Sequence, residues 1–185
     1  MYLLAARNTD ADWALVLKHF KQAGNLTDEI AGLALLRRAG KDDRDMAFAR
    51  FYDRWHADHL VIDHWFSLQA MMPGPAALAT VKRLTKHPLF SMRNPNKVRA
   101  LVFAFAGNQT NFHRPDGQGY GFIADKVREL DAINPQIAAR LLGGFRTWRT
   151  LEPDRRKIAE ATLKELAKTK PLSRDVYEIA TKMLD

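Results

Sequence analysis

Residues 87–141 read HPLFSMRNPNKVRALVFAFAGNQTNFHRPDGQGYGFIADKVRELDAINPQIAARL. This stretch contains two Asn-Pro pairs, Asn94-Pro95 and Asn134-Pro135, forty residues apart. An asparagine caps a helix well, and a proline at the first helical position loses no hydrogen bond, because that N–H has no partner inside the helix. Each pair therefore predicts the start of a helix, and the interval between the pairs predicts a repeated helical unit.

The rest of the chain carries the same helix punctuation. Apolar residues recur at helical spacing between capping residues and breakers such as Pro73-Gly74-Pro75. We expect helices at about residues 10–23, 27–39, 42–57, 59–72 and 76–86, and two more that open at Glu152-Pro153 and Ser173. No alternating strand pattern occurs, and Asp116-Gly117 falls in a loop. The sequence predicts an all-α fold.

The spacing of these helices indicates how they are arranged. Short connections and helix pairs that recur about every forty residues are typical of a helical-hairpin repeat, a HEAT- or armadillo-like α-superhelix. We expect residues 1–185 to form one such segment. The sequence repeat itself is faint, so an irregular compact helix bundle is the alternative.

Composition excludes several classes of protein. Apolar residues make up 46% and charged residues 27% of the chain, as in ordinary folded proteins. No apolar run approaches the ~20 residues that span a bilayer, and the first residues lack the pattern of a secretory signal. The absence of cysteine excludes disulfides and thiolate metal sites. We expect a cytoplasmic protein without a membrane partner.

The positive charge is concentrated in one segment. The net charge is +8, and residues 81–120 contain seven basic residues but only one acidic residue, Asp116. The basic residues are Lys82, Arg83, Lys86, Arg93, Lys97, Arg99 and Arg114. A local basic field predicts an anionic partner, and a solvated basic face without a ligand is the alternative.

Catalytic and metal-binding patterns are weak or absent. His56, His59 and His64 lie close to Asp53, Asp58 and Asp63 in the sequence. Such a histidine pair could bind zinc only with a third ligand and orienting partners, so we expect polar surface and capping roles and no metal. No histidine is directly followed by glutamate, which excludes an HExxH zinc helix, and no G-x-S-x-G elbow occurs. We predict no catalytic residue in this chain.

The loop at residues 107–119 is long for a helix connection. It ends in the glycine-rich string of residues 117–121, but neither a preceding strand nor a Walker lysine accompanies that string. We therefore expect a structural loop, held by Phe112, His113 and Tyr120, and no nucleotide site.

Arg99 and Arg140 are the candidate binding residues. Each follows an Asn-Pro pair within two turns, on a mostly apolar helix. A helix dipole disfavours a cation near the helix N-terminus, and an anion shared with the helix end would account for both arginines. The alternatives are an internal salt bridge to Asp125 or Asp131, or simple solvent exposure.

Several segments of the chain resemble one family. They are AGNLTDEIAGLALL (23–36), FYDRWHADHLVIDHWFSLQA (51–70), HPLFSMRNPNKVRALVFAFAG (87–107), FHRPDGQGYGFIADKV (112–127) and LDAINPQIAARL (130–141). They resemble the C-terminal helical domain of bacterial aminopeptidase N, an HExxH zinc metallopeptidase. The first forty and the last thirty residues resemble this domain less closely.

The resemblance implies a non-catalytic role. In that family the helical domain closes like a bowl over a catalytic domain that holds the zinc, so this chain is expected to bind no cofactor and to be inactive alone. Arg99 and Arg140 would lie on the cavity wall and contact peptide carboxylates or the catalytic domain. The partners implied are that domain and the peptide substrate. The family domain begins earlier than this sequence does, so we expect a segment truncated on its N-terminal side.

Two other functions fit the sequence. A stand-alone helical-repeat scaffold could bind an acidic protein or peptide on its concave face. A nucleic-acid binder could use the basic segment, but the aromatic residues in that segment are expected to be part of the core. We therefore expect no nucleic-acid partner.

Overall fold

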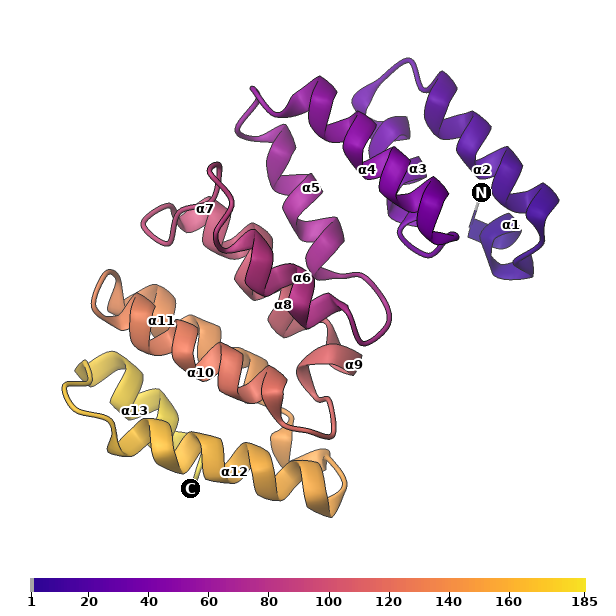
Figure 1. Cartoon of the computed structure of the whole chain (residues 1–185). Helices are drawn as coiled ribbons and strands as arrows, with labels where there is room; N and C mark the ends of the chain where they lie inside the picture. The colour runs from indigo at the N-terminus through magenta and orange to yellow at the C-terminus, as the bar shows by residue number, and fades with distance from the viewer. Residues whose placement is uncertain (1) are drawn as a thin grey trace.

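The computed structural model describes residues 2–185, and these residues form helices and connecting turns without a β-strand. The helices, labelled in Figure 1, are α1 (Tyr2–Arg7), α2 (Asp10–Gln22), α3 (Leu26–Leu36), α4 (Lys41–Trp55), α5 (Val61–Ala70), α6 (Ala77–Leu84), α7 (Pro95–Val98), α8 (Ala104–Gly107), α9 (Gln109–Phe112), α10 (Gln118–Asp131), α11 (Pro135–Leu141), α12 (Pro153–Lys168) and α13 (Arg174–Lys182). A π-helical segment, η1 (Arg99–Phe103), joins α7 to α8. Two 3₁₀ segments, η2 (Leu142–Phe145) and η3 (Trp148–Thr150), follow α11.

The helices pair into hairpins that stack along the chain (Figure 1). Helix α2 packs on α3, α4 on α5, α10 on α11 and α12 on α13, while the broken helix α7–η1–α8 follows α6, contacts it through η1, and packs mainly on α5. Neighbouring hairpins meet helix to helix, since α10 packs on α12 and α11 packs on α13. The predicted all-α repeat fold is confirmed, and the alternative of an irregular bundle is wrong.

Side-chain capping explains where six of the described helices begin. The Asn94 side chain accepts a hydrogen bond from the Asn96 N–H at 2.9 Å, and Asn134 accepts one from the Ile137 N–H at 3.1 Å. Both predicted Asn-Pro starts are confirmed. The third helix differs from its prediction, because Asn25 caps it and it begins at Leu26.

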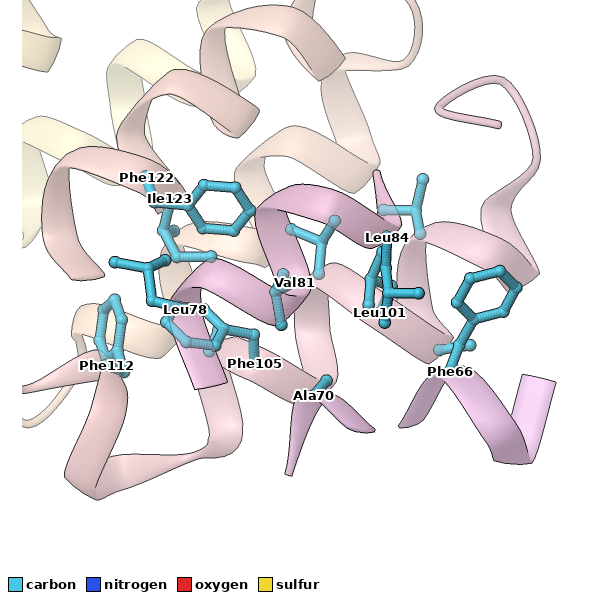
Figure 2. Close-up of a cluster of buried hydrophobic side chains, with 14 of the residues drawn as sticks. Phe66, Ala70, Leu78, Val81, Leu84, Leu101, Phe105, Phe112, Phe122 and Ile123 are labelled. Atoms are coloured by element: carbon cyan, nitrogen blue, oxygen red, sulfur yellow. The ribbon is translucent and has the colours of Figure 1, made fainter. Parts of the chain in front are cut away.

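Aromatic and aliphatic side chains join the hairpins into one core (Figure 2). Phe105 of α8 and Phe122 of α10 meet edge to face, with ring centroids 5.4 Å apart. Each buried side chain of this size contributes about 1.5–3 kcal/mol to the free energy of unfolding. The core therefore runs across the boundary between hairpins and fixes one repeat against the next.

The break in the helix that follows Asn94 is a π-helical turn. The Ala104 N–H bonds to the carbonyl of Arg99, five residues earlier. The Ala100 carbonyl accepts a hydrogen bond from Ser67 Oγ of α5 at 2.9 Å. Such turns are frequent at functional sites, and this one places Arg99 at its first position.

The surface includes a few exposed apolar side chains. Leu3 is 84% exposed and Leu15 is 49% exposed, both in the first two helices. Within residues 2–185, none of the helices combines the length and the hydropathy that a membrane crossing requires.

Candidate functional site

Arg99 lies on the surface at the junction of α7 and η1. Its Nη1 donates to Asn96 Oδ1 at 3.2 Å, a contact with a neutral side chain one turn earlier. Among residues 2–185, no carboxylate forms an ion pair with this guanidinium. Its charge is therefore available to a ligand or to another protein surface.

A buried lysine fixes the backbone directly before Arg99. Lys97 Nζ lies 2.6 Å from Asp63 Oδ1 and donates to the His59 carbonyl at 2.7 Å. The residue is only 3% exposed, because its stem packs in the core. This role was not predicted from the sequence, which suggested that Lys97 belonged to a basic surface for an anionic partner. The ion pair joins the start of α7 to the start of α5.

Arg140 lies on the surface in the last turn of α11. It lines a groove of about 370 Å³ between α11 and α13. The other lining residues are Gln136, Ala139, Asp175, Glu178 and Ile179. The groove thus combines one guanidinium with two carboxylates, and α13 supplies an acidic side that the sequence analysis did not identify.

Arg99 lies near a helix N-terminus as expected, because it follows Pro95 by about one turn in the continuous helix α7–η1–α8. The same expectation is wrong for Arg140, which occupies the last turn of α11, where the dipole favours a cation. The capping asparagines already accept hydrogen bonds from first-turn amides, those of Asn96, Lys97 and Ile137. Neither arginine is therefore needed to satisfy the amides at the start of its helix.

The proposed internal partners of the two arginines are taken by other groups. Asp125 forms an ion pair with Arg128 at 2.8 Å, and Asp131 accepts a hydrogen bond from the Ser173 N–H at 2.8 Å. Solvent exposure is therefore the observed state of both candidates. Arg99 and Arg140 lie on the second helices of consecutive hairpins.

The basic segment 81–120 divides between two helix layers. Lys97 pairs with Asp63 at 2.6 Å, and Arg114 pairs with Asp116 at 2.7 Å. The remaining five basic residues are exposed and form no ion pair with the described residues: Lys82, Arg83, Lys86, Arg93 and Arg99. Lys82 and Arg83 lie in the last turn of α6 and Lys86 lies just beyond it, whereas Arg93 precedes α7 and Arg99 is the first residue of η1.

The histidine cluster has structural partners. His56 Nδ1 lies 3.2 Å from the Tyr52 carbonyl, and the Asp58 side chain accepts hydrogen bonds from the amides of Leu60 and Val61. These two amides hold the pKa of Asp58 below its ordinary value. In the region covered by the structure, no three histidine, aspartate or glutamate side chains are grouped so that they could hold a metal ion.

The predicted contacts among Phe112, His113 and Tyr120 at the glycine-rich loop are confirmed. Phe112 and Tyr120 meet edge to face at 5.2 Å, and His113 Nδ1 lies 3.0 Å from the Tyr120 hydroxyl. Burial raises the pKa of Tyr120 to about 12 and lowers the pKa of His113. Gly117 adopts a left-handed conformation with φ of 69°, which favours glycine at that position.

Comparison with known proteins identifies the fold and its context. A family model described as a domain of unknown function (DUF3458_C) with ARM repeats matches residues 1–185. The chain is 41% identical to aminopeptidase N of Caulobacter vibrioides over 92% of its length, and 39% identical to aminopeptidase N of Escherichia coli over 98%. It spans about a fifth of the length of these relatives, 20% and 21%.

A solved structure shares the arrangement of helices. Aminopeptidase A of Legionella pneumophila, crystallised in complex with aspartic acid, superposes with a TM-score of 0.89 at 33% identity. The match covers 95% of this chain and 21% of that protein. With the stacked hairpins and the family match over every residue, the chain belongs to the DUF3458_C family of ARM-repeat domains, the C-terminal domain of bacterial aminopeptidase N.

Proposed function

We propose that this chain is a non-catalytic wall of a zinc aminopeptidase, closing the substrate cavity above a catalytic domain that lies elsewhere in a longer protein. The observation that carries the proposal is that Arg99 and Arg140 are exposed on the second helices of consecutive hairpins and form no ion pair among residues 2–185, although Asp175 and Glu178 line the groove beside Arg140. The similarity to aminopeptidase N over about a fifth of each relative supports a segment with this role.

In this role the two guanidinium groups act on the C-terminal carboxylate of a peptide or on the catalytic domain. A guanidinium binds a carboxylate through paired N–H donors, which positions the peptide as well as attracting it. The Lys97–Asp63 ion pair and the core beneath η1 hold Arg99 in place. Zinc-activated water supplies the hydrolysis in the catalytic domain, and no residue of this chain takes part in that step.

The proposed compartment is the cytoplasm, as the cysteine-free composition suits a reducing environment. The proposed partners are the catalytic domain and the peptide substrate, and neither nucleic acid nor a membrane is required.

The test is made in the full-length enzyme that carries this segment. Arg99→Ala and Arg140→Ala are compared on a peptide with a free C-terminal carboxylate and on the same peptide with a C-terminal amide. We expect kcat/KM to fall about ten- to a hundredfold for the carboxylate and to fall much less for the amide, since only the carboxylate loses a hydrogen-bonded pair of opposite charges.

Arg156→Ala is the matched control, because Arg156 is exposed on α12, a first helix of its hairpin. Equal losses on both peptides in the Arg99 and Arg140 variants, or a similar loss in the control, would contradict carboxylate recognition. The isolated chain with added zinc is expected to release no amino acid from either peptide.

A further inference from the structure

A second charged groove lies between α6 and α10, on helices that carry neither Arg99 nor Arg140. Its volume is about 480 Å³. Lys82, Arg83 and Lys86 line it from the end of α6, and Phe122, Asp125 and Lys126 line it from α10. Four cations and one carboxylate thus converge on one surface.

The carboxylates beside this groove already have partners. Asp125 pairs with Arg128 at 2.8 Å, and Glu129 pairs with Lys126 at 2.6 Å. The three basic residues of α6 are exposed and form no ion pair within residues 2–185. The groove therefore keeps a net positive charge that no side chain of the described chain neutralises.

Helix electrostatics account for only part of this cluster. Lys82 and Arg83 occupy the last turn of α6, where the helix dipole favours cations. Lys86 lies beyond the helix end, and Lys126 reaches the same groove from a different hairpin. Stabilising the end of one helix does not require basic residues from two hairpins to line one groove. Binding of an anion would use all of them.

The groove suits carboxylates better than a nucleic acid. Phe122 is only 6% exposed, with its ring packed on Phe105, so it offers no face on which a base could stack. Asp125 and Glu129 on the α10 side limit the basic surface to the groove itself, so its length matches a few consecutive carboxylates better than a long phosphate backbone.

We propose that the groove between α6 and α10 binds an acidic segment of a partner protein, with Lys82, Arg83 and Lys86 contacting its carboxylates. This surface is separate from the cavity wall proposed above, so its function does not depend on that proposal. Partner binding and substrate binding could then occur on the same domain at once.

The test measures binding of a fluorescein-labelled hexaglutamate peptide to residues 1–185 by fluorescence anisotropy. The variant K82E/R83E/K86E is compared with R156E/K157E/K168E, a triple charge reversal on α12 that gives the same change in net charge. All six positions are exposed. We expect saturable, salt-sensitive binding that weakens at least tenfold in the α6 variant and less than twofold in the α12 variant.

Three outcomes would overturn the proposal: no saturable binding of the peptide, equal losses in the two triple variants, or tighter binding of a single-stranded RNA of similar charge. Circular dichroism checks that both triple variants keep their helices. If the α6 variant unfolds, Lys82→Glu, Arg83→Glu and Lys86→Glu are measured singly, and the proposal then requires a loss of twofold or more in at least two of them.

Discussion

Lys97 Nζ lies 2.6 Å from Asp63 Oδ1, although the two residues are 34 positions apart in the sequence. The lysine side chain is 4% exposed and the aspartate side chain 19% exposed. The pair therefore joins two hairpins at a partly desolvated point, directly beside Arg99. It ties the helix that carries Arg99 to α5 through a contact below the surface.

Replacing Lys97 by methionine is expected to lower the free energy of unfolding by about 2–3 kcal/mol. The change leaves Asp63 without its counter-ion, and the figure lies below the roughly 3–5 kcal/mol for fully buried pairs because Asp63 keeps some solvent. Urea unfolding followed by circular dichroism measures the loss. Lys82→Met is the control, as Lys82 is exposed, and it should change stability by less than about 0.5 kcal/mol. A Lys97→Met variant as stable as the wild type would show that the ion pair contributes nothing.

Replacing Ser67 by alanine is expected to cost about 1 kcal/mol of unfolding free energy. The Ser67 hydroxyl donates to the Ala100 carbonyl at 2.9 Å, and Ala104 bonds instead to the carbonyls of Arg99 and Leu101. Hydrogen exchange should also show faster opening of the η1 amides in the variant than in the wild type. Unchanged exchange across residues 99–104 would mean that the π-helical turn is held without Ser67.

The sequence predicted the features of the fold that depend only on residues close together in the chain. Asn94 and Asn134 were identified as helix caps because a cap needs only the residues within one turn of it. The repeat followed from the interval between them. The π-helical turn at Arg99 was not predicted, and its Ala100 carbonyl bonds to Ser67, which lies 33 positions away in the sequence.

The sequence singled out Arg99 and Arg140 as candidates but did not predict their surroundings. Arg140 was expected near a helix start, but α11 ends at Leu141 and continues as a 3₁₀ turn through Gly143 and Gly144. From the sequence, all the basic residues of 81–120 were assigned to one positively charged surface. In the structure Lys97 forms a buried ion pair with Asp63, and the exposed basic residues divide between two helix layers. Sequence distance cannot show which side of a stacked hairpin a residue will occupy.

Two glycines of the same helix should respond to alanine in opposite directions. A methyl group on Gly119 would collide with the backbone carbonyls of Asn111 and Phe112, whereas one on Gly121 meets no atom within 4 Å. Gly119→Ala is expected to lower the free energy of unfolding by about 3 kcal/mol or more through overpacking against backbone. Gly121→Ala is expected to raise it by about 0.5–1 kcal/mol, because alanine favours the helix. Thermal unfolding of the two variants decides the matter, and loss of stability in both would refute the assigned packing.

Acidification is expected to destabilise the domain through His113. This side chain is 7% exposed, its Nδ1 lies 3.0 Å from the Tyr120 hydroxyl, and burial, with a smaller effect of Arg155, lowers its pKa below 6.5. As the pH falls, His113 is therefore protonated at a higher pH in the unfolded chain than in the folded chain. The stabilisation that the neutral, buried His113 provides is complete above about pH 6.5. It is lost as the pH falls toward the pKa of His113 in the folded state.

Urea unfolding at about pH 7.5 and pH 5.5 should thus give a lower free energy at the acidic pH, and His113→Gln should reduce that difference. His87 requires its own control, His87→Gln, because burial lowers its pKa in the same direction. The carboxylates with lowered pKa values, such as Asp58 and Asp116, still carry their charge in this range and do not contribute. If the His113→Gln variant lost as much stability on acidification as the wild type, the neutral histidine beside Tyr120 could not be the source of the pH dependence.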